Sequence, residues 1–572
     1  MNPHSSNTND DDEDTITTAA SSFVHVNTAS TTATGSGGPP LILSMQPRHE
    51  SVGLDAVDST NQNKYVVDQI CATIRALETQ EGQERAAVDI LVALDVSGSM
   101  DGDKLALCKN TLELLVRVLQ AQDRFGLITY ASEARLDLPA QRLTADHKAK
   151  CLQSIRKLTT RGCTNISAAL GLAAQEMHAV ESPNPVRSIF LLTDGLANEG
   201  ICQPAALVQL AQNCLVGDAQ LQTNNGDDDV QIELNRRSFM GFGLGSNGRT
   251  ARRRTPSPAP PATQIQFTAR SQIPITLHTF GYGVDHNETL LQEMSNATEG
   301  GSYYFVEDDK SVSTAFGDAI GGIVSVVAQN TVLHLHVPPA AAALGVKICK
   351  VHHDQVIARE NGSYTVTVGD FYGEEIRDVV LDVQLATPAE ATMDNPIPHL
   401  TAKLCYTDTL QRRPVESAAV TASISRPTGT AFSRENDHVA AQWLRVFSVE
   451  QMEQAEALAS ASNFEAARTS LGLVSAAYHQ QSPSVQAHAE STSVYQSSLG
   501  MVSEMSTNAV EYRSMGVKRS KQLLVAHKRQ RAAPMAPRHY TVPTSGGLTS
   551  APTGTNAPYD TKSKKAMRTM FS

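Results

Sequence analysis

The chain has 572 residues and a net charge of −12, from 47 Lys and Arg against 59 Asp and Glu. At roughly 150 residues per domain, this length predicts two to four domains. The acidic balance argues against bulk nucleic-acid binding, and a single Trp with 5% aromatic residues argues against a platform for stacking bases.

Eight cysteines are scattered along the sequence, and no two form a C-x-x-C pair. Zinc ribbons and RING fingers therefore lack their usual ligands. Several of these cysteines fall inside apolar helix or strand patterns, where reduced and buried thiols are expected.

Residues 1–38 are polar, rich in Ser and Thr, and acidic, which predicts a disordered N-terminal arm. They contain no apolar signal core, and no run in the chain reaches the roughly 18 apolar residues of a spanning helix. We therefore expect an intracellular protein that does not enter a membrane. The cytoplasm is the expected compartment, with the nucleus as the alternative.

Residues 39–85 contain two apolar segments, 40–45 and 65–77, that are predicted to be strands. A helix is the alternative for the second segment. Both precede the α/β pattern described next, so they must pair with strands outside it.

The most informative motif begins with an apolar run over residues 88–94, which is typical of a strand buried on both faces. The run ends in Asp95, and Ser97 and Ser99 follow at alternate positions, with Gly98 permitting a tight bend. One carboxylate and two hydroxyls on a single turn present three oxygens to one point. That is the chemistry preferred by a hard octahedral cation such as Mg²⁺.

An Asp-x-Ser-x-Ser pattern after a buried strand resembles the metal-ion-dependent adhesion site (MIDAS) of von Willebrand factor type A (VWFA) domains. Two further segments of that family follow in the expected order. Thr164 lies in a loop that opens a helical pattern, and Asp194 directly follows an apolar run over residues 188–193. The resemblance implies that Thr164 adds a third hydroxyl and that Asp194 adds a second carboxylate, often acting through water.

The predicted metal ligands share oxygen donors and loop positions, and they are Asp95, Ser97, Ser99, Thr164 and Asp194. The expected ion is Mg²⁺ or another divalent cation such as Mn²⁺ or Ca²⁺. A type A domain whose metal site has been lost is the alternative.

Residues 86–306 alternate apolar strands with amphipathic helices, which predicts an α/β fold with a doubly wound, mostly parallel, Rossmann-like sheet. Residues 133–138 are the predicted edge strand. In such sheets ligands bind at the carboxyl ends of strands, near the switch in strand order, and Asp95 and Asp194 both follow strands on that side.

The predicted VWFA domain is interrupted by residues 217–271, which are polar and rich in Gly and Pro. This composition predicts a disordered insertion. Ser-Pro and Thr-Pro dipeptides beside arginines make it a candidate for phosphorylation, and an ordinary solvated loop is the alternative.

Residues 307–431 change to a period of two, which predicts antiparallel strands. Together with residues 39–85 they are expected to form a small β-sandwich that flanks the sheet domain. Residues 369–375 resemble a turn in the β region that follows many VWFA domains of the interacting type. His334 and His336 alternate at a metal-capable spacing, which a partly exposed strand face explains equally well.

Residues 432–531 are predicted to be helical, and residues 532–572 are predicted to be a disordered tail. The segment 512–531 resembles the end of plant wavy-growth-type ubiquitin ligases, which combine a RING finger, a VWFA domain and this β and helical region. Because the RING is missing from this sequence, ligase activity does not carry over. The basic residues of this segment predict a solvated helix face, with a nuclear signal as the alternative.

The resemblance implies a non-catalytic scaffold that binds proteins. A Mg²⁺ ion at the predicted site keeps one open position, which an Asp or Glu carboxylate of a partner can complete. The alternative is an adaptor that recruits substrates in a ubiquitin-ligase pathway without its own RING. No paired carboxylates or His set accompany the metal ligands, so we expect no enzymatic activity. The acidic balance and the lack of a long apolar run lead us to expect no nucleic-acid partner and no membrane partner.

Overall fold

The computed structural model describes most of the chain from residue 39 onward, while the predicted N-terminal arm (1–38) and the predicted insertion (217–271) lie outside the described residues. The described residues are 39–56, 65–78, 85–215, 274–283, 285–307, 309–359, 362–392, 395–507, 512–531, 541–544, 547–550 and 559–571. None of the helices in these ranges is long and apolar enough to cross a membrane.

A six-stranded sheet forms the core of the α/β domain, with strand order β5-β4-β3-β6-β7-β8. All neighbouring strands are parallel except β4 and β5, which form an antiparallel pair at one edge. Both β3 and β6 are buried along their whole length, as apolar strands covered on two faces must be. The α/β fold class and the edge strand are thus confirmed. The strands are β3 (Val88–Asp95), β4 (Arg124–Tyr130), β5 (Ala134–Arg142), β6 (Val186–Thr193), β7 (Thr276–Tyr282) and β8 (Tyr303–Val306).

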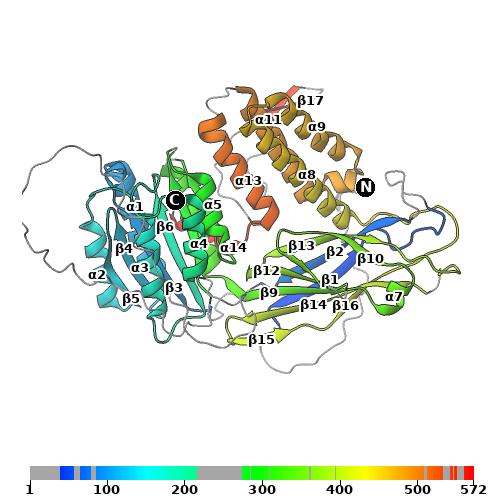
Figure 1. The fold of residues 1–572 in the computed structure, drawn as a ribbon, viewed down its shortest axis with the longest axis horizontal. Coiled ribbons are helices and arrows are strands. Elements are labelled where there is room, and N and C mark those ends of the chain that lie inside the picture. Colours follow the sequence, from blue (N-terminus) through cyan, green and yellow to red (C-terminus); the bar gives the residue numbers. More distant parts are fainter. Residues whose placement is uncertain are drawn as a thin grey trace, which may run out of the picture. The chain divides into compact units, whose positions relative to one another are not determined.

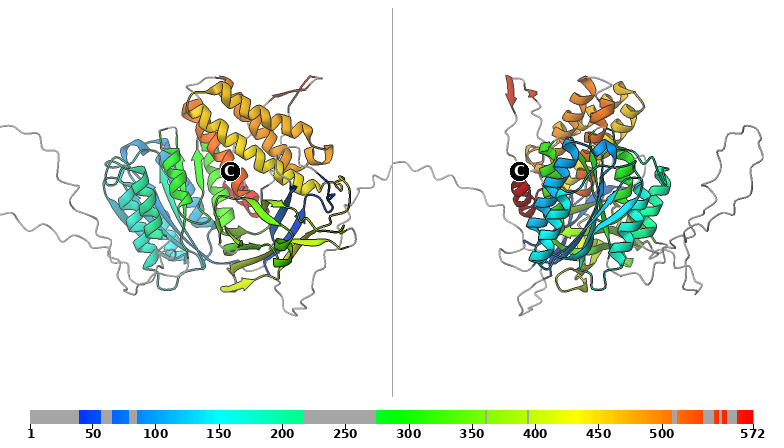
Figure 2. Two further views of the ribbon diagram at one scale, coloured as in Figure 1. Left: turned by 45° about the vertical axis from the view of Figure 1, so that its right-hand side comes forward. Right: turned by 90° about the vertical axis from the view of Figure 1, so that its left-hand side faces the viewer.

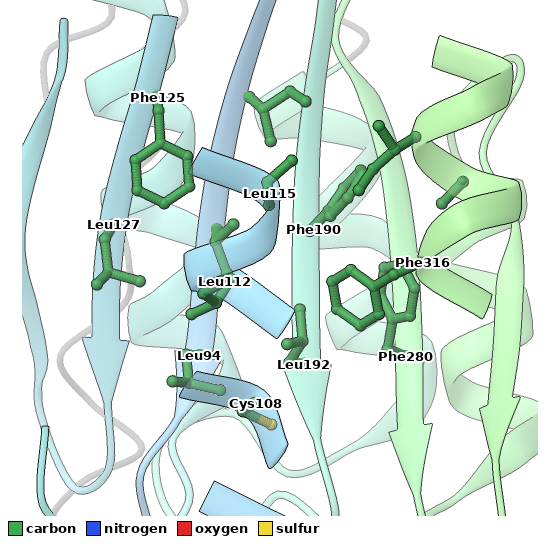
Figure 3. Close-up of a cluster of buried hydrophobic side chains, with 14 of the residues drawn as sticks. Leu94, Cys108, Leu112, Leu115, Phe125, Leu127, Phe190, Leu192, Phe280 and Phe316 are labelled. Carbon is green, nitrogen blue, oxygen red and sulfur yellow. The ribbon is translucent and has the colours of Figure 1, made fainter. Parts of the chain in front are cut away.

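Helices pack against both faces of this sheet (Figure 1). Alternate residues of β3 point to opposite faces, so Val92 enters one core with α1, α2 and α6, and Leu91 enters another with α3, α4 and α5. Figure 3 shows the first core, in which Leu115 of α1 and Phe316 of α6 lie on the side of Phe190 of β6. The helices are α1 (Asp103–Val118), α2 (Ala145–Arg156), α3 (Ile166–His178), α4 (Pro204–Leu215), α5 (Glu288–Asn296) and α6 (Asp309–Ile323).

Helix α6 belongs to the core of this sheet, whereas the predicted boundary at residue 306 assigned it to the β-sandwich. The Phe316 ring stacks on Phe280 of β7, with ring centroids 4.4 Å apart. The prediction was wrong because α6 runs almost directly into strand β9 (Val326–His336), so no change in composition marks where one domain ends.

Two antiparallel sheets form the β-sandwich, with orders β1-β2-β13-β10 and β11-β12-β9-β14-β15, and β16 also pairs with β14 (Figures 1 and 2). Residues 67–76 form a strand and not a helix, and this strand pairs with β13. The α/β domain is therefore inserted between two strands of a single sheet. The elements are β1 (Leu41–Pro47), β2 (Val67–Ala76), β9 (Val326–His336), α7 (Pro339–Ala343), β10 (Lys347–His352), β11 (Val356–Ala358), β12 (Tyr364–Tyr372), β13 (Ile376–Gln384), β14 (Ile397–Asp408), β15 (Arg413–Glu416) and β16 (Val420–Ile424).

The helical region packs around a separate apolar core that includes Met452, Leu471 and Met501. Before α13 the chain forms a π turn over Tyr512–Gly516, where the Tyr512 ring leaves no space for a side chain at Gly516. The helices are α8 (Asp437–Ser460), α9 (Phe464–Gln480), α10 (Pro483–Gln486), α11 (Ala489–Thr507) and α13 (Val517–Arg529).

The basic residues of α13 do not form a solvated face, and that prediction is wrong. Lys518 is only 4% exposed and donates to Glu288 of α5 at 2.8 Å. Arg519 is 6% exposed and pairs with Glu307. The basic side chains are buried because acidic partners distant in sequence neutralise them, and a linear pattern does not reveal such partners.

The C-terminal tail was predicted to be disordered, but its end forms helix α14 (Lys562–Phe571), which packs on α6. Lys564 is 2% exposed and its Nζ lies 3.0 Å from an Asp318 carboxylate oxygen. A ten-residue helix is too short to be stable alone, so packing rather than helix propensity orders it. A short hairpin, β17 (Thr541–Thr544) with β18 (Gly547–Ser550), precedes it.

The close approach of α14 to α6 predicts the effect of Gly321→Ala. A Cβ at Gly321 would lie 2.7 Å from Lys564 Cα, so the substitution should push α14 away at a cost of about 1–3 kcal/mol. We expect trypsin to cleave within residues 562–568 faster than in the wild type, and the urea midpoint to fall. Gly472→Ala is the matched control, because in the described structure its added Cβ has no atom within 4 Å beyond its chain neighbours and its own helix backbone. Cleavage at wild-type rates in both variants would contradict the packing argument.

Burial of His278 in β7 predicts a pH-dependent stability. Burial, and then the charges of Arg531, Arg529 and Lys564, lower the pKa of His278 to about 3. As the pH falls below about 6.5, the unfolded chain takes up a proton that the folded chain does not, so stability falls by about 1.4 kcal/mol per pH unit for this group. The variant His278→Phe keeps the aromatic contact with Phe190 but loses the titrating imidazole. Between pH 6 and 4 its free energy of unfolding should fall with a slope smaller than that of the wild type by about 1.4 kcal/mol per pH unit.

The control for this measurement is the exposed His336. His336→Phe should leave the pH slope of urea unfolding as it is in the wild type. A slope unchanged in His278→Phe would show that His278 takes no part in acid destabilisation.

Candidate metal centre

The first two predicted ligand segments meet at the carboxyl end of β3. Asp95 is the last residue of β3, and the Ser97 backbone N–H donates to its Oδ1 at 2.8 Å. A short 3-10 turn over Gly98–Met100 follows and brings Ser99 Oγ to 3.1 Å from Ser97 Oγ. The alternation of Asp95, Ser97 and Ser99 therefore converges on one point, as the spacing predicted.

Asp194 reaches the same point from the neighbouring strand β6. Ser99 Oγ donates to Asp194 Oδ1 at 2.7 Å, and Thr193 Oγ1 donates to Asp95 Oδ2 at 2.8 Å. The Ser99 hydroxyl thus links the turn after β3 to Asp194, and the Thr193 hydroxyl links the end of β6 to Asp95. Such contact requires β3 and β6 to be parallel neighbours, and they are paired up to Leu94 and Leu192.

Thr164 completes the group from the loop before α3. Its backbone N–H donates to Asn198 Oδ1 at 2.7 Å, and its carbonyl accepts from Asn198 N–H at 3.0 Å, so the loop is held against the segment after β6. A Cβ placed at Gly195 would lie 3.8 Å from Ser99 Oγ and 3.9 Å from Thr164 Oγ1. The structure therefore brings all five predicted residues together at one edge of the sheet.

The group is buried except on one side. Asp95, Ser97, Thr164 and Asp194 are each at most 2% exposed, whereas Ser99 is exposed. Solvent and any partner therefore reach the group from the side of Ser99.

The site holds two buried carboxylates, Asp95 and Asp194, and in the described structure one cation, Lys104, pairs with them. Burial raises the pKa of Asp95 to about 6, although hydrogen bonds from Ser97 and Thr193 oppose the shift. Asp194 pairs with the Lys104 ammonium, whose Nζ also lies 3.4 Å from the Ser99 carbonyl oxygen. Among the described residues no cationic side chain pairs with Asp95, so two buried carboxylates share a single ammonium. An all-oxygen donor set with surplus negative charge fits a hard divalent cation.

Lys104 and Thr193 were missed by the sequence analysis. Thr193 immediately precedes Asp194, and Lys104 lies in the first turn of α1, close behind the Asp-x-Ser-x-Ser motif. Proximity in sequence was the available signal. His334 and His336, the other metal candidates, belong to no cluster of three potential ligands in the described part of the chain.

Comparison with known proteins identifies the domain that carries this group. Residues 89–318 match the family model for the von Willebrand factor type A domain. The E3 ubiquitin-protein ligase WAV3 of Arabidopsis thaliana is 25% identical over 313 residues, which cover 54% of this chain and 32% of that protein. An uncharacterised protein of Escherichia coli (strain K12), YfbK, is 34% identical over 134 residues, covering 23% of each chain. The chain thus spans under a third of either relative.

One solved structure resembles most of the chain. A von Willebrand factor type A protein from Catenulispora acidiphila aligns with a TM-score of 0.54 at 14% identity, covering 84% of this chain and 96% of that one. At this identity the likeness shows the fold alone.

The ammonium of Lys104 beside Asp194 should weaken the binding of a cation at the candidate metal site. Lys104→Met removes the ammonium beside Asp194, so Mg²⁺ affinity measured by calorimetry should rise about five- to tenfold. Lys109→Met on the same helix is the matched control, because among the described residues the Lys109 ammonium contacts the Arg156 carbonyl, which lies outside the candidate metal site. Equal Mg²⁺ affinity in the wild type and in both variants would show that the charge of Lys104 does not affect ion binding at this site.

Proposed function

Because residues 89–318 of this chain form a von Willebrand factor type A domain, we propose that the protein is a non-catalytic scaffold that binds protein partners through a metal ion. The ion is Mg²⁺, or Mn²⁺ or Ca²⁺, held by Asp95, Ser97 and Ser99 with Thr164 and Asp194. The observation that carries the proposal is the convergence of five oxygen-bearing side chains on one edge of the sheet with one uncompensated negative charge.

The exposed side of Ser99 supports a partner that supplies an acidic side chain. VWFA domains are in general modules for protein interaction. A divalent ion bound by buried protein oxygens on one side keeps a position facing solvent on the other. An Asp or Glu carboxylate that replaces water there gains a strong and directional contact with the ion.

The same geometry supports a binding role over catalysis. Hydrolysis at a bound metal requires a general base beside the water it activates. In the described structure, the Asp95 and Asp194 carboxylates are engaged by hydroxyls and by Lys104. We therefore propose that the protein has no enzymatic activity of its own.

A role as an adaptor in a ubiquitin-ligase pathway is the second candidate. The similarity to WAV3 covers 54% of this chain, so it extends beyond the type A domain. In that role the scaffold would recruit a substrate while a catalytic subunit is supplied elsewhere. Recovery of a ubiquitin ligase with the full chain, and of ubiquitin conjugates among its partners, separates this candidate from a scaffold of another pathway.

The central test replaces Asp95 by its neutral isostere. Asp95→Asn should lower Mg²⁺ affinity by about tenfold or more, because the ion loses a charged ligand. The amide oxygen can still accept from the Ser97 backbone N–H, and the amide NH2 can donate to the Thr193 hydroxyl once that hydroxyl turns to accept. Calorimetric titration with Mg²⁺ and capture of partners with and without EDTA give the readouts.

The matched control is Asp146→Asn, an exposed carboxylate in the first turn of α2, which should behave as the wild type. Mg²⁺ heats that are the same in Asp95→Asn and in the wild type would overturn the proposed metal site. Partner capture that EDTA leaves unchanged would overturn the metal-dependent mechanism of binding.

A further inference from the structure

We propose that Cys71, Asp378 and His438 form a second metal site, suited to Zn²⁺, where the β-sandwich contacts the helical region. Cys71 lies on β2, Asp378 on the adjacent strand β13, and His438 in the first turn of α8. One ligand atom from each residue lies within 4.8 Å of the other two. Among the described residues, no other three His, Cys, Asp or Glu side chains meet in this way.

The distances within this cluster are close to those of a zinc site. Asp378 Oδ1 accepts from His438 Nε2 at 2.9 Å and from Cys71 Sγ at 3.4 Å. Zn–ligand bonds of about 2.0–2.3 Å in tetrahedral geometry separate ligand atoms by about 3.3–3.8 Å. The two distances to Asp378 therefore need to lengthen by only a few tenths of an ångström to match this range.

The fourth ligand of the zinc ion would be the Thr73 hydroxyl or a water molecule beside the partly exposed His438. Thr73 Oγ1 lies 3.8 Å from Cys71 Sγ and 3.4 Å from His438 Nε2. The side chain of His438 is 30% exposed, whereas that of Asp378 is 2% exposed. Three protein ligands with one position left for water or a hydroxyl is a recurring arrangement for zinc.

The neighbours of Asp378 hold it in place, as the supporting residues of metal ligands do. The Asp378 backbone N–H donates to Gln530 Oε1 at 2.9 Å, and Gln530 Nε2 donates back to the Asp378 carbonyl at 2.9 Å. Arg445 donates to the same carbonyl at 3.2 Å. The carboxylate therefore faces Cys71 and His438 from a backbone that is fixed by the helical region.

The charges of the cluster suit Zn²⁺ better than Mg²⁺. A thiolate, a carboxylate and a neutral imidazole bring two negative charges to a dication, so the loaded site is neutral, and the thiol proton leaves to solvent. Sulfur and imidazole ligands favour zinc, whereas magnesium requires oxygen. A Cys–His nucleophile is ruled out by access, since Cys71 is 0% exposed and a substrate would not reach it.

The site would join three elements that are distant in sequence. Around it, Val380 of β13 and Val439 and Val446 of α8 pack on Cys71 in a small buried cluster. An ion there would tie β2 and β13 to α8, and its binding energy would add to the stability of the folded chain.

The test uses Co²⁺ as a spectroscopic substitute for zinc on the full chain after removal of metal with a chelator. One equivalent of Co²⁺ should produce a thiolate-to-metal charge-transfer band, and Zn²⁺ should displace it. Cys71→Ser should lose the band. Cys349→Ser, which changes an exposed cysteine, should keep it, and so should Asp95→Asn, whose defect lies in the other site.

Stability gives a second readout that does not depend on the Cys71 variant folding. Zn²⁺ should raise the thermal midpoint of the wild type and of Asp95→Asn, and it should raise that of His438→Gln less. The proposal is overturned if the folded wild type shows no thiolate band with Co²⁺ and no Zn²⁺-dependent rise in its midpoint. A band that survives in Cys71→Ser would equally overturn it.

Discussion

The parallel pairing of β3 with β6 is the constraint on which the candidate metal site depends. The pairing brings the two strand ends side by side at the switch in strand order. Asp95 and Asp194 then lie in one buried space, and two like charges in such a space are costly unless other groups satisfy them. The Ser99 and Thr193 hydroxyls and the Lys104 ammonium do so in part. The negative charge that remains is the basis of the proposed cation site at this edge.

Buried ion pairs attach the end of the helical region to the β-sandwich and to this α/β domain. Arg531 pairs with Glu375 at 2.8 Å, and its guanidinium lies 3.9 Å from the centre of the Tyr372 ring. Helix α13 makes similar pairs with Glu288 and Glu307. Breaking a desolvated pair leaves a buried charge, so these contacts specify one arrangement more strongly than exposed salt bridges would.

Short-range patterns predicted the strands well because each apolar run is long enough to reveal its environment. Residues 88–94 and 188–193 are buried on both faces, as their composition implied. Short-range patterns do not reveal the environment of His286, which lies just before α5. His286 is 3% exposed and its Nε2 lies 2.7 Å from the Tyr303 hydroxyl, while Asn287 caps α5. The partner of a buried polar group comes from another strand, and local sequence carries no sign of it.

The sequence by itself determined the α/β fold, the order of its strands and helices, and the five residues that meet at the sheet edge. Periodicity predicts the elements, and a short motif marks Asp95, Ser97 and Ser99, because both depend on neighbours only a few residues apart. Thr164 and Asp194 were added by the resemblance to the VWFA family. Only the tertiary structure decided that α13 is buried, that α14 docks on α6, and that Cys71, Asp378 and His438 lie together. Those outcomes depend on charge pairs and close packing between segments that are far apart in the sequence. The spacing of residues along the chain therefore does not reveal which of them come into contact.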